Sequence, residues 1–148
     1  MIKYIVGIGI LLFLVLISLA FIFPGSVHYE IDFTLKNARP NYESIRIDLK
    51  RFVEKDGFNC DNPDFNITRE TPEKNLRMVC FGDKGELGIE VMSKDILIRY
   101  YTSETYPMFY MVTGYEPKQY FVDTKESLKV FIRKYSDKFN IIENEIVK

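Results

Sequence analysis

The hydrophobic and polar positions of this chain form two patterns that meet near residue 26. From Tyr4 to Phe23 the sequence reads YIVGIGILLFLVLISLAFIF, twenty residues without a charge. A helix of that length is roughly 30 Å long, which matches the hydrocarbon core of a bilayer. A charged side chain at the centre of a membrane would cost about 2.5 to 3.5 kcal/mol, and the run contains none. The pattern predicts an N-terminal transmembrane anchor or signal segment over residues 1–26 and a separate domain over residues 27–148.

The charges that flank the apolar run predict its orientation. Lys3 and the amino terminus precede it, whereas the first charged residues after it are Glu30 and Asp32. Positive charge favours the cytoplasmic side of a membrane. We expect a single pass through an inner or plasma membrane over residues 4–23, with the N-terminus cytoplasmic and the C-terminal domain periplasmic or extracytoplasmic.

Cleavage of the apolar run is the competing interpretation. Small residues at Ser18 and Ala20 are typical of a signal-peptide cleavage site near Ala20, which would release a secreted domain. Against cleavage, residues 21–23 continue the apolar run past that site. Pro24 and Gly25 then break the helix where a spanning segment should end. We favour a retained anchor, with cleavage as the alternative.

Alternation with a period of two predicts the strands of the second domain. Residues 27–36 place apolar side chains on one face and polar ones on the other, as expected of a half-buried strand. The same alternation recurs over residues 75–81, 86–92 and 96–102, with turn residues between the runs. These three runs predict an antiparallel meander. Residues 141–147 are either a last strand or a frayed tail.

Helical spacing appears twice in the same domain. After Pro40, apolar residues recur on one face of residues 42–53, and Gly57 is placed to end that helix. A second helix is predicted to begin at Asp123, because Glu126 three residues later completes a capping box. The fold class is therefore α+β: a two-layer sandwich in which two helices cover one face of an antiparallel sheet of about four to five strands. By architectural analogy this is similar to a ferredoxin-like plan with one strand added, an analogy that does not imply a function.

The two cysteines, Cys60 and Cys80, predict one disulfide if the domain is exported. The alternative is a pair of buried thiols. Charge adds a second constraint, because the chain has 21 acidic and 20 basic residues and a net charge of −1. Nucleic-acid binding would require a basic stripe, which is missing, so no nucleic-acid partner is expected.

No motif for catalysis, a cofactor or a metal stands out. His28 is the only histidine, no Gly-x-Ser-x-Gly elbow occurs, and the cysteines lack the paired spacing of zinc ligands. Carboxylates such as Glu86, Glu90 and Asp95 could in principle serve a hydrolase. With 21 acidic residues, however, such neighbours arise by chance. We expect no enzyme, no cofactor and no metal.

Tyrosine and phenylalanine gather between residues 100 and 121. Tyrosine is enriched at interfaces because its large rigid ring carries a polar tip. The candidate interaction surface consists of Tyr101, Tyr106, Phe109, Tyr110, Tyr115 and Tyr120. The alternative is that these rings complete the core.

The meander also predicts a face that points away from the helices and is more apolar than water contact alone would favour. That face comprises Arg77, Val79, Phe81, Met92, Leu97, Arg99 and Tyr101. The leading hypothesis is a membrane-anchored, exported protein-interaction module, such as a subunit of an envelope complex or an immunity-type inhibitor. The alternatives are a domain that binds a small ligand, a lipid or a glycan through the aromatic segment, and, last, a carboxylate-dependent hydrolase.

Overall fold

The computed structural model describes residues 2–22, 24–60, 77–107 and 118–147. Its internal contacts define two compact units. The first unit is made of residues 1–27 and 103–116, and the second of residues 28–102 and 117–148. The first unit contains helix α1, and the second contains most of a sheet with two further helices.

Helix α1 (Ile2–Ile22) occupies the apolar run. Its large apolar side chains between Ile8 and Ile17 are exposed by 39 % to 64 %, on all sides of the helix. The hydroxyl of Ser18 donates to the carbonyl of Leu14 at 2.8 Å, so this polar side chain is satisfied within the helix. Among the residues that the structure describes, no helix is long and apolar enough to cross a membrane. The expected transmembrane helix is therefore not confirmed.

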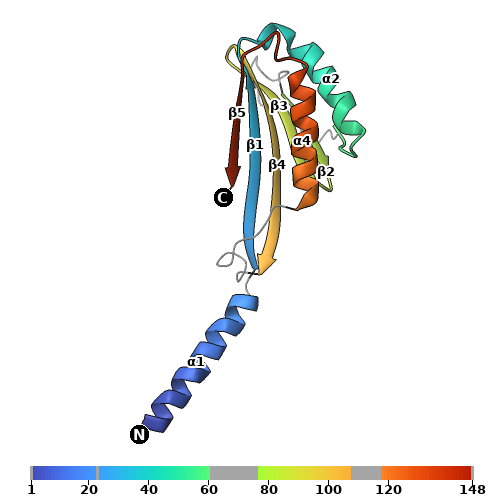
Figure 1. The fold of residues 1–148 in the computed structure, drawn as a ribbon. Coiled ribbons are helices and arrows are strands. Elements are labelled where there is room, and N and C mark those ends of the chain that lie inside the picture. Colours follow the sequence, from blue (N-terminus) through green and yellow to red (C-terminus); the bar gives the residue numbers. More distant parts are fainter. Residues whose placement is uncertain (1, 23, 61–76, 108–117, 148) are drawn as a thin grey trace, which may run out of the picture. The chain divides into compact units, whose positions relative to one another are not determined.

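Five antiparallel strands form one sheet in the order β2-β3-β4-β1-β5. They are β1 (Pro24–Leu35), β2 (Arg77–Gly82), β3 (Gly85–Met92), β4 (Asp95–Pro107) and β5 (Ile141–Val147). Strand β1, the first in sequence, lies between β4 and β5 (Figure 1). The last strand runs antiparallel to β1, with Tyr29 opposite Val147. Residues 141–147 thus form a strand rather than a frayed tail.

Helices α2 (Tyr42–Glu54) and α4 (Gln119–Arg133) lie on one side of this sheet (Figure 1). A short 3₁₀ turn, Arg39–Asn41, leads into α2. After α2, Gly57 has a φ of +87°, the left-handed conformation expected at a helix end. In each of β1 to β4, alternate side chains are buried on one face. Aromatic rings join the layers, since Phe121 of α4 packs on Tyr29 and Tyr100 of the sheet. The expected α+β sandwich is confirmed.

Two element boundaries differ from the sequence-based expectation. Helix α4 begins at Gln119, one turn before the predicted capping box, because the fully buried ring of Phe121 extends the apolar stripe of the helix toward its N-terminus. Strand β4 continues to Pro107 instead of ending near Thr102. Its alternation persists there in polar residues, since Thr102 and Glu104 are buried while Ser103 and Thr105 are exposed.

The predicted disulfide between Cys60 and Cys80 is present. It joins the segment after α2 to β2, across 20 residues of sequence. Next to it, the backbones of Asn59 and Phe81 exchange two hydrogen bonds, at 2.7 and 2.9 Å. The covalent link and this short bridge therefore hold the same two segments together.

Candidate functional site

The sheet face opposite α2 and α4 is the candidate site, and we call it the outer face. As predicted, it carries Arg77, Val79 and Phe81 of β2, which alternate with the buried Met78 and Cys80. No helix among the described residues covers it (Figure 1). Its side chains on β1, β3 and β4 follow from the same alternation and from the strand register: His28, Glu30, Asp32, Thr34, Glu86, Gly88, Glu90, Met92, Leu97, Arg99 and Tyr101.

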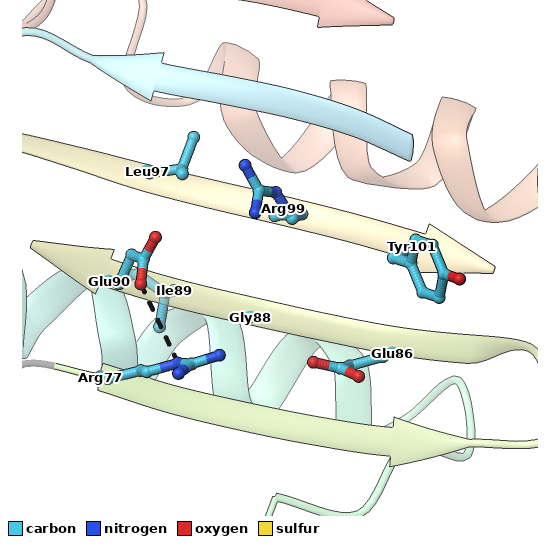
Figure 2. Close-up of a pocket in the computed structure, with 8 residues that line it drawn as sticks. All are labelled: Arg77, Glu86, Gly88, Ile89, Glu90, Leu97, Arg99 and Tyr101. Carbon is cyan, nitrogen blue, oxygen red and sulfur yellow. Dashed lines mark ion pairs between the residues drawn. The ribbon is translucent and has the colours of Figure 1, made fainter. Parts of the chain in front are cut away.

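A hollow lies at the middle of the outer face, where Gly88 of β3 has no side chain (Figure 2). Gly88 is paired with Val79 on one neighbouring strand and with Arg99 on the other. A Cβ atom at this position would meet only the carbonyl oxygen of Met78, at an ordinary 3.6 Å. We call this depression the Gly88 hollow; its lining also includes Arg77, Glu86, Ile89, Glu90, Leu97, Arg99 and Tyr101.

Arg99 is held firmly at the β1 side of the hollow. Its guanidinium donates to both carboxylate oxygens of Asp32, at 2.8 and 3.0 Å, and lies 3.0 Å from Glu30. The hydrogen bond to Asp32 raises the pKa of Arg99, partial burial opposes the rise, and the charges of Asp32 and Glu30 add to it. Two carboxylates on β1 therefore fix and neutralise this cation, so Arg99 is a wall of the hollow rather than a free ligand group.

Tyr101 forms the wall at the end of the hollow that lies toward Glu86 (Figure 2). Its hydroxyl is hydrogen-bonded to Nδ1 of His28 at 2.7 Å, and the two rings stack with centroids 5.8 Å apart. The ring of Tyr101 is thereby oriented by a neighbour on β1. The only histidine of the chain positions a tyrosine in this structure.

Glu86 and Arg77 approach the hollow from opposite ends and point toward one another (Figure 2). The guanidinium of Arg77 is within 3.9 Å of Glu90, at the limit of an ion pair. The carboxylate of Glu86 has no hydrogen bond or ion pair among the described residues. Glu86 is therefore the acidic group at the hollow that is available to a ligand.

Leu97 is the apolar residue of β4 that lines the hollow. Although it lies on the outer face, where it is paired with Glu90 of β3, Leu97 is only 5 % exposed. The outer face therefore combines a nearly buried leucine, a fixed aromatic ring and charged groups. A face in contact with water alone would rarely contain a buried leucine.

The structure brings together only part of the predicted aromatic surface. Tyr101 lies on the outer face, whereas Tyr120 lies on α4, in the other layer, with the ammonium of Lys118 5.9 Å from its ring. Tyr106 belongs to β4. Phe109, Tyr110 and Tyr115 lie outside the described residues.

Sequence reasoning missed Gly88, the free carboxylate of Glu86 and the clamp on Arg99. The sequence did contain a signal for Gly88, because a glycine inside an alternating strand often marks a close approach of another group. The clamp depends on the pairing of β1 with β4, which alternation within a single strand does not specify.

Hydrogen bonds already engage Asp95 at one end of this face. Of the three acids considered for a hydrolase, Asp95 accepts a hydrogen bond from Lys36 at 2.8 Å and another from the backbone of Asn37 at 2.9 Å. These bonds, with that of Lys36 the larger influence, lower the pKa of Asp95, which is the opposite of what a general acid needs. Within the described ranges, no group of three or more His, Cys, Asp or Glu side chains is placed to hold a metal ion.

No protein-family model, curated protein or solved structure matches this chain.

Proposed function

We propose that this protein is a membrane-associated, non-enzymatic interaction module that docks another protein through the outer face of its sheet. The observation that carries the proposal is the Gly88 hollow. It presents a tyrosine, two arginines and a nearly buried leucine on a sheet face that no described helix covers. Tyrosine and arginine are among the side chains enriched in protein interfaces, and a hollow beside them can receive a side chain of the partner.

The apolar N-terminal segment supports association with lipid. A helix that is hydrophobic on every side needs an apolar environment on every side. Between Ile8 and Ile17 the described side chains are exposed to solvent all around α1. A bilayer in contact with residues 4–23 would remove this surface from water, and the flanking Lys3 favours a cytoplasmic N-terminus.

The disulfide supports an exported location for the second unit. Disulfides persist in oxidising compartments such as the periplasm or the cell exterior and are rare in the cytosol. The bond between Cys60 and Cys80 therefore agrees with a C-terminal domain outside the cytoplasm. Cleavage near Ala20 would give the same domain in secreted form.

The architecture is similar to a ferredoxin-like plan with one strand added at an edge. The order β3-β4-β1-β5 reproduces the four-stranded arrangement of that plan, and β2 is the added strand. Folds of this kind host many functions, so the analogy adds nothing to the choice of function.

A small-ligand, lipid or glycan site is the second candidate, favoured by the fixed ring of Tyr101 at the hollow. The volume of the hollow is about 40 Å³, far below the roughly 300 to 1,000 Å³ of small-molecule sites. It lies on one sheet face without an opposite wall among the described residues. A small molecule would remain largely hydrated there, whereas a protein partner would bring the missing wall.

Site-specific photo-crosslinking tests the proposal. A benzophenone side chain replaces Val79 on the outer face or, as a matched control, Ile47 on α2, which is 42 % exposed. The full chain is then irradiated in membranes of its native host. We expect a discrete polypeptide adduct at position 79 and none at position 47. Adducts of equal yield at both positions, adducts with lipid alone, or the absence of adducts at position 79 would overturn the proposal.

A further inference from the structure

We propose that the Gly88 hollow receives one basic side chain, a lysine or an arginine, of the protein that docks on the outer face. The inference rests on the proposed function and specifies the chemistry of the partner. Its central contact is between the partner's cation and the carboxylate of Glu86.

The charges of the outer face favour a cation. Within strands β1 to β4 this face carries two guanidinium groups, Arg77 and Arg99, against five carboxylates. The carboxylates are Glu30, Asp32, Glu86, Glu90 and Asp95. At one end of the face Lys36 and Asp95 neutralise each other at 2.8 Å. The face therefore has an excess of negative charge, and complementary potentials steer partners together.

Among the described residues, the ion pairs leave one carboxylate for this role. Arg99 is engaged by Glu30 and Asp32, at 3.0 and 2.8 Å. Arg77 lies beside Glu90. A partner anion at the hollow would meet the unpaired carboxylate of Glu86. It would also compete with Asp32 and Glu30 for Arg99, and with Glu90, 3.9 Å away, for Arg77. A partner cation would complete the pairing instead.

The shape of the hollow suits a long basic side chain. The missing side chain at Gly88 leaves room for an aliphatic stem to lie against the strand, beside the nearly buried Leu97. Tyr101, held by His28, presents a ring near Glu86 that can contribute a cation–π contact. Lysine and arginine both combine an apolar stem with a charged end, so one side chain would satisfy both parts of the hollow.

The test uses a defined probe. The full chain, labelled with ¹⁵N and held in nonionic detergent micelles, is titrated with Nα-acetyl-lysine methylamide and followed by NMR. The norleucine analogue, which keeps the stem but lacks the ammonium, is the probe control. We expect saturable shifts of the backbone amides of residues 86–90 and 97–101 with the lysine probe. The shifts should weaken as salt is added, and the norleucine analogue should give none.

Two variants locate the contact. Glu86→Gln removes the charge while keeping the shape of the side chain. It should lower the affinity for the lysine probe about fivefold, the upper range for an exposed ion pair. Gly88→Val fills the hollow with a residue that suits a strand, and should abolish the shifts. Glu126→Gln, on the exposed face of α4, is the matched charge control and should bind as the wild type does. Thermal unfolding of each variant is measured to check that the fold is retained.

The inference and the proposed function fail differently. If the position-79 adduct persists with undiminished yield in Glu86→Gln and in Gly88→Val, a protein docks there but without a basic side chain in the hollow. Equal shifts with the lysine and norleucine probes, or unchanged affinity in Glu86→Gln, would also overturn the inference. If position 79 gives no adduct in the wild type, the proposed function itself falls.

Discussion

At the scale of single residues, two buried phenols show how a hydroxyl can stabilise or destabilise the same core. Burial raises the pKa of both Tyr42 and Tyr135. The hydroxyl of Tyr135 donates to Asp48 at 2.9 Å. The hydroxyl of Tyr42 is buried and has no hydrogen-bond partner among the described residues. An unpaired buried hydroxyl costs free energy, so only one of the two tyrosines is well matched to its site.

This difference predicts opposite effects of the same substitution. Tyr42→Phe removes an unsatisfied group and should leave the free energy of unfolding unchanged or raise it by up to about 1 kcal/mol. Tyr135→Phe loses a hydrogen bond to a carboxylate and should lower it by about 1 to 2 kcal/mol. Urea unfolding of the full chain in nonionic detergent measures both. Equal losses in the two variants would contradict the assigned hydrogen bonding.

Single residues were also where the sequence was least informative about the site. The alternation within each strand predicted that Arg77, Leu97 and Tyr101 would share a face, and they do. It did not predict that Arg99 would be clamped by two acids more than sixty positions earlier in the chain. Nor did it predict the burial of Leu97. Such features depend on which strands become neighbours, and strand pairing is a property of the whole sheet.

At the scale of elements, periodicity predicted the helices and strands of the second unit. Local capping residues were a less reliable guide to where a helix begins. The first strand, α2 and the meander lie close to where alternation and helical spacing placed them. The prediction that α4 begins at Asp123 was wrong, because packing of Phe121 against Tyr29 outweighs the capping box at that position. Tertiary burial of an aromatic ring contributes more than a cap.

The link between α2 and β2 yields a prediction at this scale. Closing a loop of about 20 residues by a disulfide stabilises a protein by roughly 3 kcal/mol through the unfolded chain. Replacing both Cys60 and Cys80 by alanine should therefore lower the free energy of unfolding by about 3 kcal/mol. Hydrogen exchange should rise first at Asn59 and Phe81, whose backbone bridge lies next to the bond.

Reduction of the wild-type protein serves as the control for the cysteine substitutions, because it opens the bond without altering the core. A loss of similar size is expected under reducing conditions. Unchanged stability in both experiments would show that the short bridge alone holds the two segments.

At the scale of the whole molecule, the proposed membrane association yields a prediction about the apolar N-terminal segment. Substituting arginine for Leu12 and Val15 together should shift the full chain from membranes to the supernatant of an alkaline carbonate extraction. Each arginine near the centre of a bilayer costs about 2.5 to 3.5 kcal/mol. The control replaces the same residues by isoleucine, which keeps the run apolar. Retention of the arginine variant in membranes would show that other residues hold the protein there.

The pairing of the first strand with the last has a consequence for biosynthesis. Tyr29 faces Val147, so β1 must wait for more than a hundred further residues before its second neighbour exists. At translation rates of about 5 to 20 residues per second, that delay is on the order of ten seconds. During this time one side of β1 offers free backbone groups to any extended chain nearby. A ribosome-associated or translocation-associated chaperone that shields β1 until β5 is synthesised would therefore raise the yield of folded protein.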